Sequence, residues 1–184
     1  MSKVELGQIS LKLYNEVAYS LYIHGKQNLL FLYNIEMKIT IPQQIQEWAF
    51  KLSDGILGEE KLPLCPWAKK AVLDGSVDCW VDENPLDLIP LPEEIKVRIV
   101  HLPGKSLTEI IEIRDLCNSG EEEFIFLESH PEDPEMIGGI KSVSDLPLII
   151  IQRRKELLEA RKILAKGNYY QYWDPEVLSK MLNI

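Results

Sequence analysis

From residue 42 onward, apolar positions along the chain follow two periods, one typical of helices and one typical of strands. The segment 42–55 is apolar at every third or fourth position, which predicts an amphipathic helix. Val77, Cys79 and Val81 occupy alternate positions, which predicts a strand with one buried face. The same two patterns predict strands over 96–102, 124–127 and 146–151, and helices over 66–73, 106–118, 153–166 and from 174.

This order of elements predicts an α+β fold. We expect residues 42–184 to form a single domain, a mixed sheet of four to five strands with helices packed mainly on one face. Ser106 and Glu109 have the spacing of a capping box and predict the start of the helix over 106–118. The stretches 85–92 and 129–144 are rich in proline or glycine and are expected to be loops.

Residues 1–41 fit both periods. Ile9, Leu11 and Leu13 alternate as a strand would, while Ile9, Leu13 and Val17 recur at helical spacing. Residues 25–28 resemble a turn between two apolar stretches. We interpret the segment as an N-terminal extension that forms a β-hairpin, and periodicity leaves the helical alternative open.

Composition narrows the class of protein. The chain has 184 residues, of which 46% are hydrophobic and 27% charged, as in an ordinary globular protein. Its net charge of -9 disfavours binding to nucleic acid, because a negative field repels phosphate backbones. No apolar run approaches the roughly 18 residues of a membrane span, and the first residues lack the pattern of a signal peptide. We therefore expect a cytoplasmic protein that binds no membrane.

Cys65 is the first candidate for chemistry. Pro66 follows it directly and helix formers come next, which places the thiol at the first turn of the predicted helix 66–73. The free N–H groups of that turn favour a thiolate, and Lys69, one turn further on, would strengthen this effect. The alternative is that Cys65 is a small apolar side chain packed under the loop. Three cysteines without a CxxC pair argue against disulfides and zinc, and we expect no metal ion and no cofactor.

His130 and Arg153 are the other candidates, because each directly follows an apolar strand. Functional side chains are often presented at the ends of strands. His130 lies among carboxylates that could orient its ring, and it could serve as a base for a cysteine nucleophile. Arg153 suits recognition of a carboxylate or phosphate. The alternatives are an exposed loop histidine and a surface arginine in an ion pair.

Three blocks of the sequence resemble a bacterial domain family of unknown function, in the same order and at similar spacing from about residue 42 to residue 161. Trp67 replaces the usual phenylalanine of the first block, and Asp145 stands where the family has a proline. The resemblance implies a site that contains Cys65, His130 and Arg153, with Ser144 and Lys69 as further ligand-binding residues, and it implies no particular reaction. The matching blocks are 64–69 (Leu-Cys-Pro-Trp-Ala-Lys), 129–134 (Ser-His-Pro-Glu-Asp-Pro) and 144–147 with Arg153.

Residues 65–69 are also similar to the Cys-Pro-Phe-Ala motif of omega-class glutathione transferases. In those proteins a strong strand precedes the motif, whereas 58–64 in this chain does not resemble a strand. A thioredoxin fold is therefore not expected.

Two functions remain in competition. In the first, the chain is an enzyme-like domain in which Cys65 is the nucleophile, His130 the base and Arg153 the anchor of an anionic small molecule. In the second, the chain is a non-catalytic interaction or accessory protein. The first requires the three side chains to meet around one pocket, and the second predicts that they are dispersed. The sequence does not indicate an oligomeric state.

Overall fold

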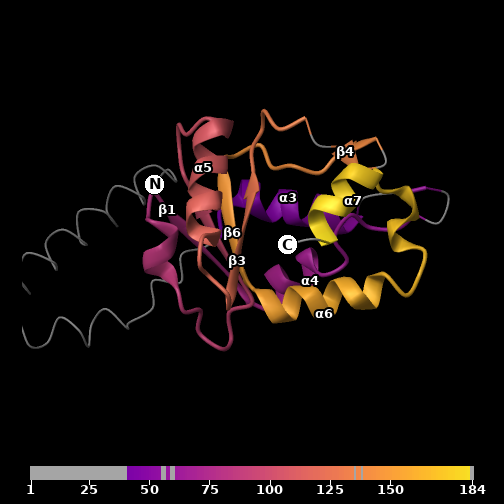
Figure 1. Cartoon of the computed structure of the whole chain (residues 1–184), viewed down its shortest axis with the longest axis horizontal. Coiled ribbons are helices and arrows are strands. Elements are labelled where there is room, and N and C mark those ends of the chain that lie inside the picture. Colours follow the sequence, from indigo (N-terminus) through magenta and orange to yellow (C-terminus); the bar gives the residue numbers. More distant parts are fainter. Residues whose placement is uncertain (1–40, 55–56, 59–60, 135, 138, 183–184) are drawn as a thin grey trace, which may run out of the picture. The chain divides into compact units, whose positions relative to one another are not determined.

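The computed structural model describes residues 41–54, 57–58, 61–134, 136–137 and 139–182. The chain divides into two units, 1–38 and 39–184, so the expected hairpin lies outside the described residues apart from Ile41. The elements of the second unit are α3 (Gln43–Asp54), α4 (Ala68–Leu73), β1 (Val77–Val81), η1 (Pro85–Leu88), β2 (Val97–His101), α5 (Leu107–Asn118), β3 (Phe124–Ser129), β4 (Met136–Ile137), β5 (Ile140–Lys141), β6 (Leu148–Arg153), α6 (Arg154–Leu164), η2 (Tyr169–Tyr172) and α7 (Pro175–Leu182) (Figure 1).

The main sheet is mixed and four-stranded, with the order β1-β2-β6-β3. Strand β1 runs parallel to β2, while β6 is antiparallel to both β2 and β3. Strands β4 and β5 form a separate two-stranded sheet within the stretch expected to be irregular. The predicted α+β class with a mixed sheet is confirmed.

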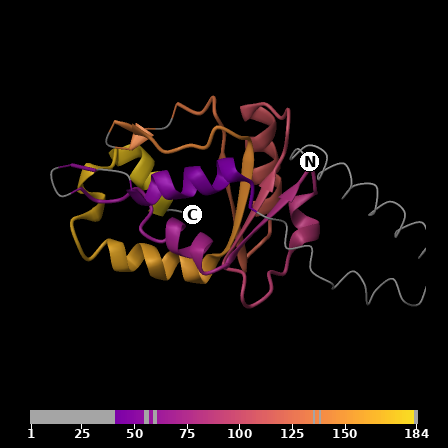
Figure 2. The same ribbon diagram turned by 180° about the vertical axis from the view of Figure 1, so that it is seen from behind.

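Each face of the main sheet is covered by helices. On one face, Val100, Phe126 and Ile149 pack with Ile110 and Cys117 of α5. On the other face, Cys79, Ile99 and Leu148 pack with residues of α3 and α4. Figures 1 and 2 show α5 on one side of the sheet and α3 and α4 on the other. The expectation that helices lie mainly on one face therefore does not describe this core.

The predicted start of α5 is confirmed. The Glu109 N–H donates to the Ser106 hydroxyl, and the Glu109 carboxylate accepts from the Ser106 N–H at 2.9 Å. These two bonds satisfy N–H groups that a helix leaves without partners at its first turn. The bond from the Ser106 N–H, followed by the pairing with Lys105, lowers the pKa of Glu109 to about 2.

Candidate functional site

Cys65 lies in the turn before α4, which begins at Ala68 and has only six residues. The thiol accepts hydrogen bonds from the N–H groups of Trp67 and Ala68, and these bonds lower its pKa, as predicted for a cysteine at a helix start. Burial acts in the opposite direction and is the larger effect, so the pKa of the Cys65 thiol is raised above its ordinary value. In this environment the protonated thiol is favoured.

The residues that cover Cys65 come from the C-terminal part of the chain. The Tyr169 hydroxyl donates to the main-chain carbonyl of Leu64, directly before the cysteine. Burial raises the pKa of both Tyr169 and Tyr170, and a negative charge on Cys65 would raise them further, which shows that both phenols lie close to the sulfur. Cys65 is thus a half-buried residue with two phenols near its thiol.

We expect iodoacetamide to label Cys65 more slowly than an exposed thiol at pH 7, because the raised pKa of Cys65 leaves little thiolate. The measurement uses the variant Cys79→Ala/Cys117→Ala, in which Cys65 is the only thiol, and follows the rate from pH 6 to pH 10. N-acetylcysteine serves as the reference. Labelling of Cys65 faster than the reference at pH 7 would contradict the prediction.

His130 is buried at the end of β3, with 4% of its surface exposed. Its Nδ1 accepts from the Glu132 N–H at 3.1 Å, so the ring proton lies on Nε2, which donates to the Lys105 carbonyl at 3.0 Å. Both ring nitrogens are thus occupied by main-chain groups. The imidazole therefore links the loop at Lys105 to the loop at Glu132. Because both ring nitrogens are hydrogen-bonded, neither is available to a nucleophile.

Arg153 ends β6 instead of starting the following helix. Its guanidinium donates to the carbonyls of Leu91, Pro92 and Ile95, each at 2.8 Å. The side chain therefore holds the proline-rich loop against the end of the sheet. A guanidinium that donates to three carbonyls has little capacity left for an anionic ligand.

Ser144 and Lys69 also bind neighbouring groups of the chain. The buried Ser144 accepts the Leu146 N–H at 2.9 Å, and its own N–H donates to the Ser129 hydroxyl at 2.8 Å. The Lys69 ammonium lies 3.2 Å from the Asp54 carboxylate and above the Phe50 ring.

The predicted site residues do not converge. In the pairing of β3 with β6, Ser129 lies opposite Leu148 and Phe124 lies opposite Arg153. His130 and Arg153 are thus at opposite ends of these strands, about 20 Å apart along them at roughly 3.3 Å per residue. The hydrogen bond from the Ser144 N–H to the Ser129 hydroxyl places Ser144 at the same end of β3 as His130. Lys69 lies in α4, four residues after Cys65 in the sequence. In the described part of the chain, no hydrogen bond or ion pair joins Cys65, His130 and Arg153.

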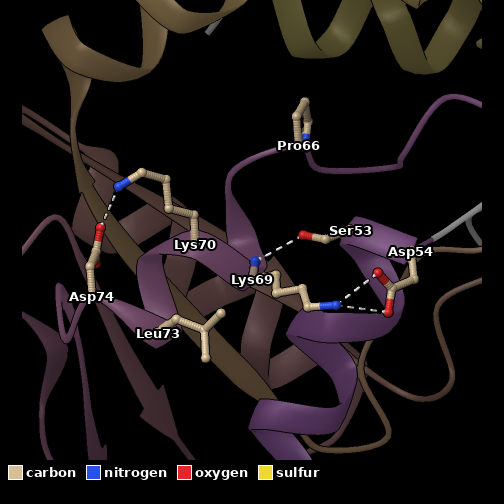
Figure 3. Close-up of a pocket in the computed structure, with 7 residues that line it drawn as sticks. All are labelled: Ser53, Asp54, Pro66, Lys69, Lys70, Leu73 and Asp74. Carbon is tan, nitrogen blue, oxygen red and sulfur yellow. Dashed lines mark hydrogen bonds and ion pairs between the residues drawn. The ribbon is translucent and has the colours of Figure 1, made fainter.

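An open hollow of about 490 Å³ lies beside α3 and α4 (Figure 3). Its cations are already paired, since Lys69 binds Asp54 and Lys70 lies 2.9 Å from Asp74. The hollow therefore presents balanced charge and does not favour an anionic ligand. The residues that line it are Ser53, Asp54, Pro66, Lys69, Lys70, Leu73 and Asp74.

The described residues contain neither a metal-binding cluster nor a membrane-spanning helix. No group of three or more His, Cys, Asp or Glu residues in these ranges could hold a metal ion. Among the helices described, none has the length and apolar character needed to cross a membrane.

The outer edge of β3 is closed by side chains. Asn118 donates to the Phe126 carbonyl at 2.8 Å and accepts from the Phe126 N–H at 3.0 Å. Glu121 accepts from the Phe124 N–H at 2.9 Å, and Arg154 donates to the Phe124 carbonyl at 3.1 Å. These side chains occupy main-chain groups with which another strand would pair.

The outer edge of β1 is different. The Ser76 carbonyl accepts from Val97, and the Asp82 N–H donates to His101, so even-numbered residues from 76 to 82 face β2. The N–H and C=O groups of Val77, Cys79 and Val81 therefore point away from the sheet, because successive residues of a strand face opposite sides. No described residue bonds to these outward groups. Val77 and Cys79 are only 8% and 1% exposed, so their outward main-chain groups are covered, whereas Val81 at the end of the strand is 48% exposed.

Side-chain interactions fix the position of β1 in the sheet. The Arg98 guanidinium binds the Asp78 carboxylate through two nitrogens at 2.9 and 2.6 Å and also donates to the Leu88 carbonyl. It lies over the Trp80 ring, whose Nε1 has no partner in the described ranges. Val77 and Cys79 are buried in the core. The edge is therefore a fixed feature of the sheet.

No family model, curated protein or solved structure matches the chain. The resemblance to a bacterial domain family thus remains a prediction. The exposed end of β1 at Val81 was not among the predicted sites. Alternation over 76–81 indicated a strand, but only the order of strands in the sheet identifies it as an edge.

Proposed function

We propose that this chain is a non-catalytic protein-interaction module that binds an extended segment of another protein at the C-terminal end of β1, around Val81. The observation that carries this proposal is the contrast between the two edges of the sheet. Side chains close the edge of β3, whereas Val81, at the end of β1, is 48% exposed and its outward main-chain groups have no partner in the described part of the chain. An extended peptide can add to such an edge through main-chain hydrogen bonds.

The environments of the predicted catalytic groups favour this proposal over the enzyme hypothesis. Covalent catalysis by cysteine needs a thiolate and a base within hydrogen-bonding reach. Burial raises the pKa of Cys65, and both nitrogens of His130 bind main-chain groups. Arg153 likewise uses its donors on a loop. Each of these residues has a contact within the chain that accounts for its position.

The fixed geometry of β1 also supports binding. Because the edge is already extended and anchored by Arg98, a partner would not have to order it, and the entropy cost falls mainly on the partner. Next to the edge, Val81 is 48% exposed and Leu86 is 38% exposed. These side chains offer apolar contact in addition to the main-chain hydrogen bonds.

The test uses a seven-residue peptide of alternating valine and threonine, acetylated and amidated, with a fluorophore for anisotropy. Val81→Pro removes an outward N–H without removing a hydrogen bond to β2, so the fold should tolerate it. We expect Val81→Pro to weaken peptide binding at least tenfold, whereas the control Val81→Thr, which keeps the N–H, binds as the unaltered protein does. Circular dichroism checks the fold of both variants.

A second measurement does not depend on a variant. Methylating the peptide nitrogens on one edge of the bound strand should abolish binding, whereas methylating the alternate set should have little effect. Failure of the unmodified peptide to bind, or equal binding of both methylated peptides, would contradict the proposed function.

A further inference from the structure

From the packing of the C-terminal residues, we infer that residues 167–182 form a strap that opens and closes over Cys65 while the main sheet stays folded. The C-terminal strap contains η2 and α7 and follows α6. Figures 1 and 2 show it on the same side of the main sheet as α3 and α4, away from α5. Opening exposes the Cys65 thiol and the apolar side chains under the strap together, so the strap controls access to this part of the domain.

The C-terminal strap rests on a small apolar cluster that is separate from the two cores of the main sheet. This satellite cluster contains the buried Leu57, Leu64 and Ile137, against which Tyr172 and Trp173 of the strap pack. All of its members come from outside the strands of the main sheet. The strap can therefore detach without uncovering either core, and segments of this kind open at a lower free energy than the whole domain.

The larger contacts of the domain also leave the strap aside. Among the described elements, they join the strands to one another, α3 to α4, and α5 and α6 to the main sheet, and neither η2 nor α7 takes part in them. Residues 165–168, which connect α6 to the strap, are all exposed and include Gly167. An exposed turn with a glycine can absorb a change in backbone angles, so it suits a hinge.

The aromatic rings of the strap contact one another and move together. The Tyr169 and Tyr170 rings meet edge to face with 5.1 Å between their centroids, and the Trp173 ring lies 5.4 Å from that of Tyr170. Such contacts add to the stability of an aromatic cluster beyond the area that it buries. The segment around these rings therefore opens as a unit rather than residue by residue.

The closed position depends on few interactions. The Tyr169 hydroxyl donates to the Leu64 carbonyl, and the Tyr172 ring lies where a side chain at Gly58 would overlap it. In the opposite sense, the indole N–H of Trp173 is buried without a hydrogen-bond partner in the described part of the chain. Opening lets water bind this group and recovers the cost of burying it, which favours the open state.

Thiol labelling tests the strap, because the three cysteines report on three different regions. Cys117 and Cys79 are buried in the cores on the two faces of the main sheet, whereas Cys65 lies near Tyr169 of the strap. The full chain is treated with fluorescein maleimide at urea concentrations below those that unfold the sheet, and mass spectrometry assigns the label. We expect Cys65 to react at least tenfold faster than the other two, at a rate that rises with urea because opening exposes surface.

Two variants at one position separate opening from simple exposure of the thiol. Tyr172→Ala removes a ring that packs on the satellite cluster and should raise the labelling rate of Cys65 about tenfold. The phenols that lie near the thiol are those of Tyr169 and Tyr170, so this change leaves them in place. Tyr172→Phe is the matched control: it keeps the ring and removes a hydroxyl that bonds to no described residue, and it should change the rate by less than about twofold.

The labelling of the unaltered protein decides the question even if Tyr172→Ala does not fold. A Cys65 rate that does not rise with urea, or that is the same in Tyr172→Ala and Tyr172→Phe, would overturn the strap in favour of a thiol that is simply exposed. Labelling of all three cysteines at one rate would also overturn it, because the strap and the sheet would then unfold together. Circular dichroism in the same urea series checks that the sheet remains folded.

Discussion

Replacing Arg98 with methionine is expected to destabilise the protein by about 3–5 kcal/mol, the usual cost of removing one partner from a buried ion pair. Arg98 is buried and donates to the Asp78 carboxylate and to the Leu88 carbonyl. Without it, the carboxylate of Asp78, which is largely covered, has no counter-charge. The free energy of unfolding in urea measures this loss.

Two control variants test whether the loss of stability comes from breaking the buried ion pair. Arg98→Met/Asp78→Asn removes both charges and should be more stable than Arg98→Met alone, because no uncompensated carboxylate remains. Lys155→Met removes an exposed cation from α6 and should change stability by less than about 0.5 kcal/mol. A loss below 1 kcal/mol for Arg98→Met, or no recovery in the double variant, would mean that the pair does not anchor β1.

Replacing Arg153 with methionine is expected to cost about 2–4 kcal/mol, because the carbonyls of Leu91, Pro92 and Ile95 lose a charged donor. Hydrogen exchange should also become faster in residues 91–96, the loop that this side chain holds. Urea unfolding and exchange measured by mass spectrometry test the two parts.

Arg153→Lys is the matched control for this second prediction. Lysine keeps the charge but cannot reproduce the forked geometry of a guanidinium, so it should recover less than half of the loss. The sequence hypothesis that Arg153 anchors an anion predicts a different result. If phosphate stabilises the unaltered protein and does not stabilise Arg153→Met, the assignment of Arg153 to the loop is contradicted.

Much of the fold could be predicted because its signals are local. The periods of apolar residues located each strand of the main sheet, and the capping box of Ser106 and Glu109 located the start of α5. The short strands β4 and β5 were missed because two residues are too few to show a period. Helix α4 begins at Ala68 rather than Pro66, since the preceding residues form a turn.

The candidate site was less predictable because its contacts are distant in sequence. The position of Cys65 before a helix was predicted, but its burial involves Tyr169, more than 100 residues further along the chain. His130 and Arg153 do lie at ends of strands, yet their partners, Lys105 and the loop 91–95, follow from strand order and loop path. The order of strands in the main sheet also places β1 at its edge. Local patterns do not encode such pairings.

Amide hydrogen exchange along β1, followed residue by residue by NMR, tests the central claim most directly. We predict that the Val81 amide exchanges faster than those of Asp78, Trp80 and Asp82 in the protein alone. Adding the valine–threonine peptide should slow exchange of the Val81 amide at least tenfold and leave β3 unchanged. Protection of the Val81 amide before the peptide is added, or no change after saturation with it, would contradict the binding of an extended segment at the end of β1.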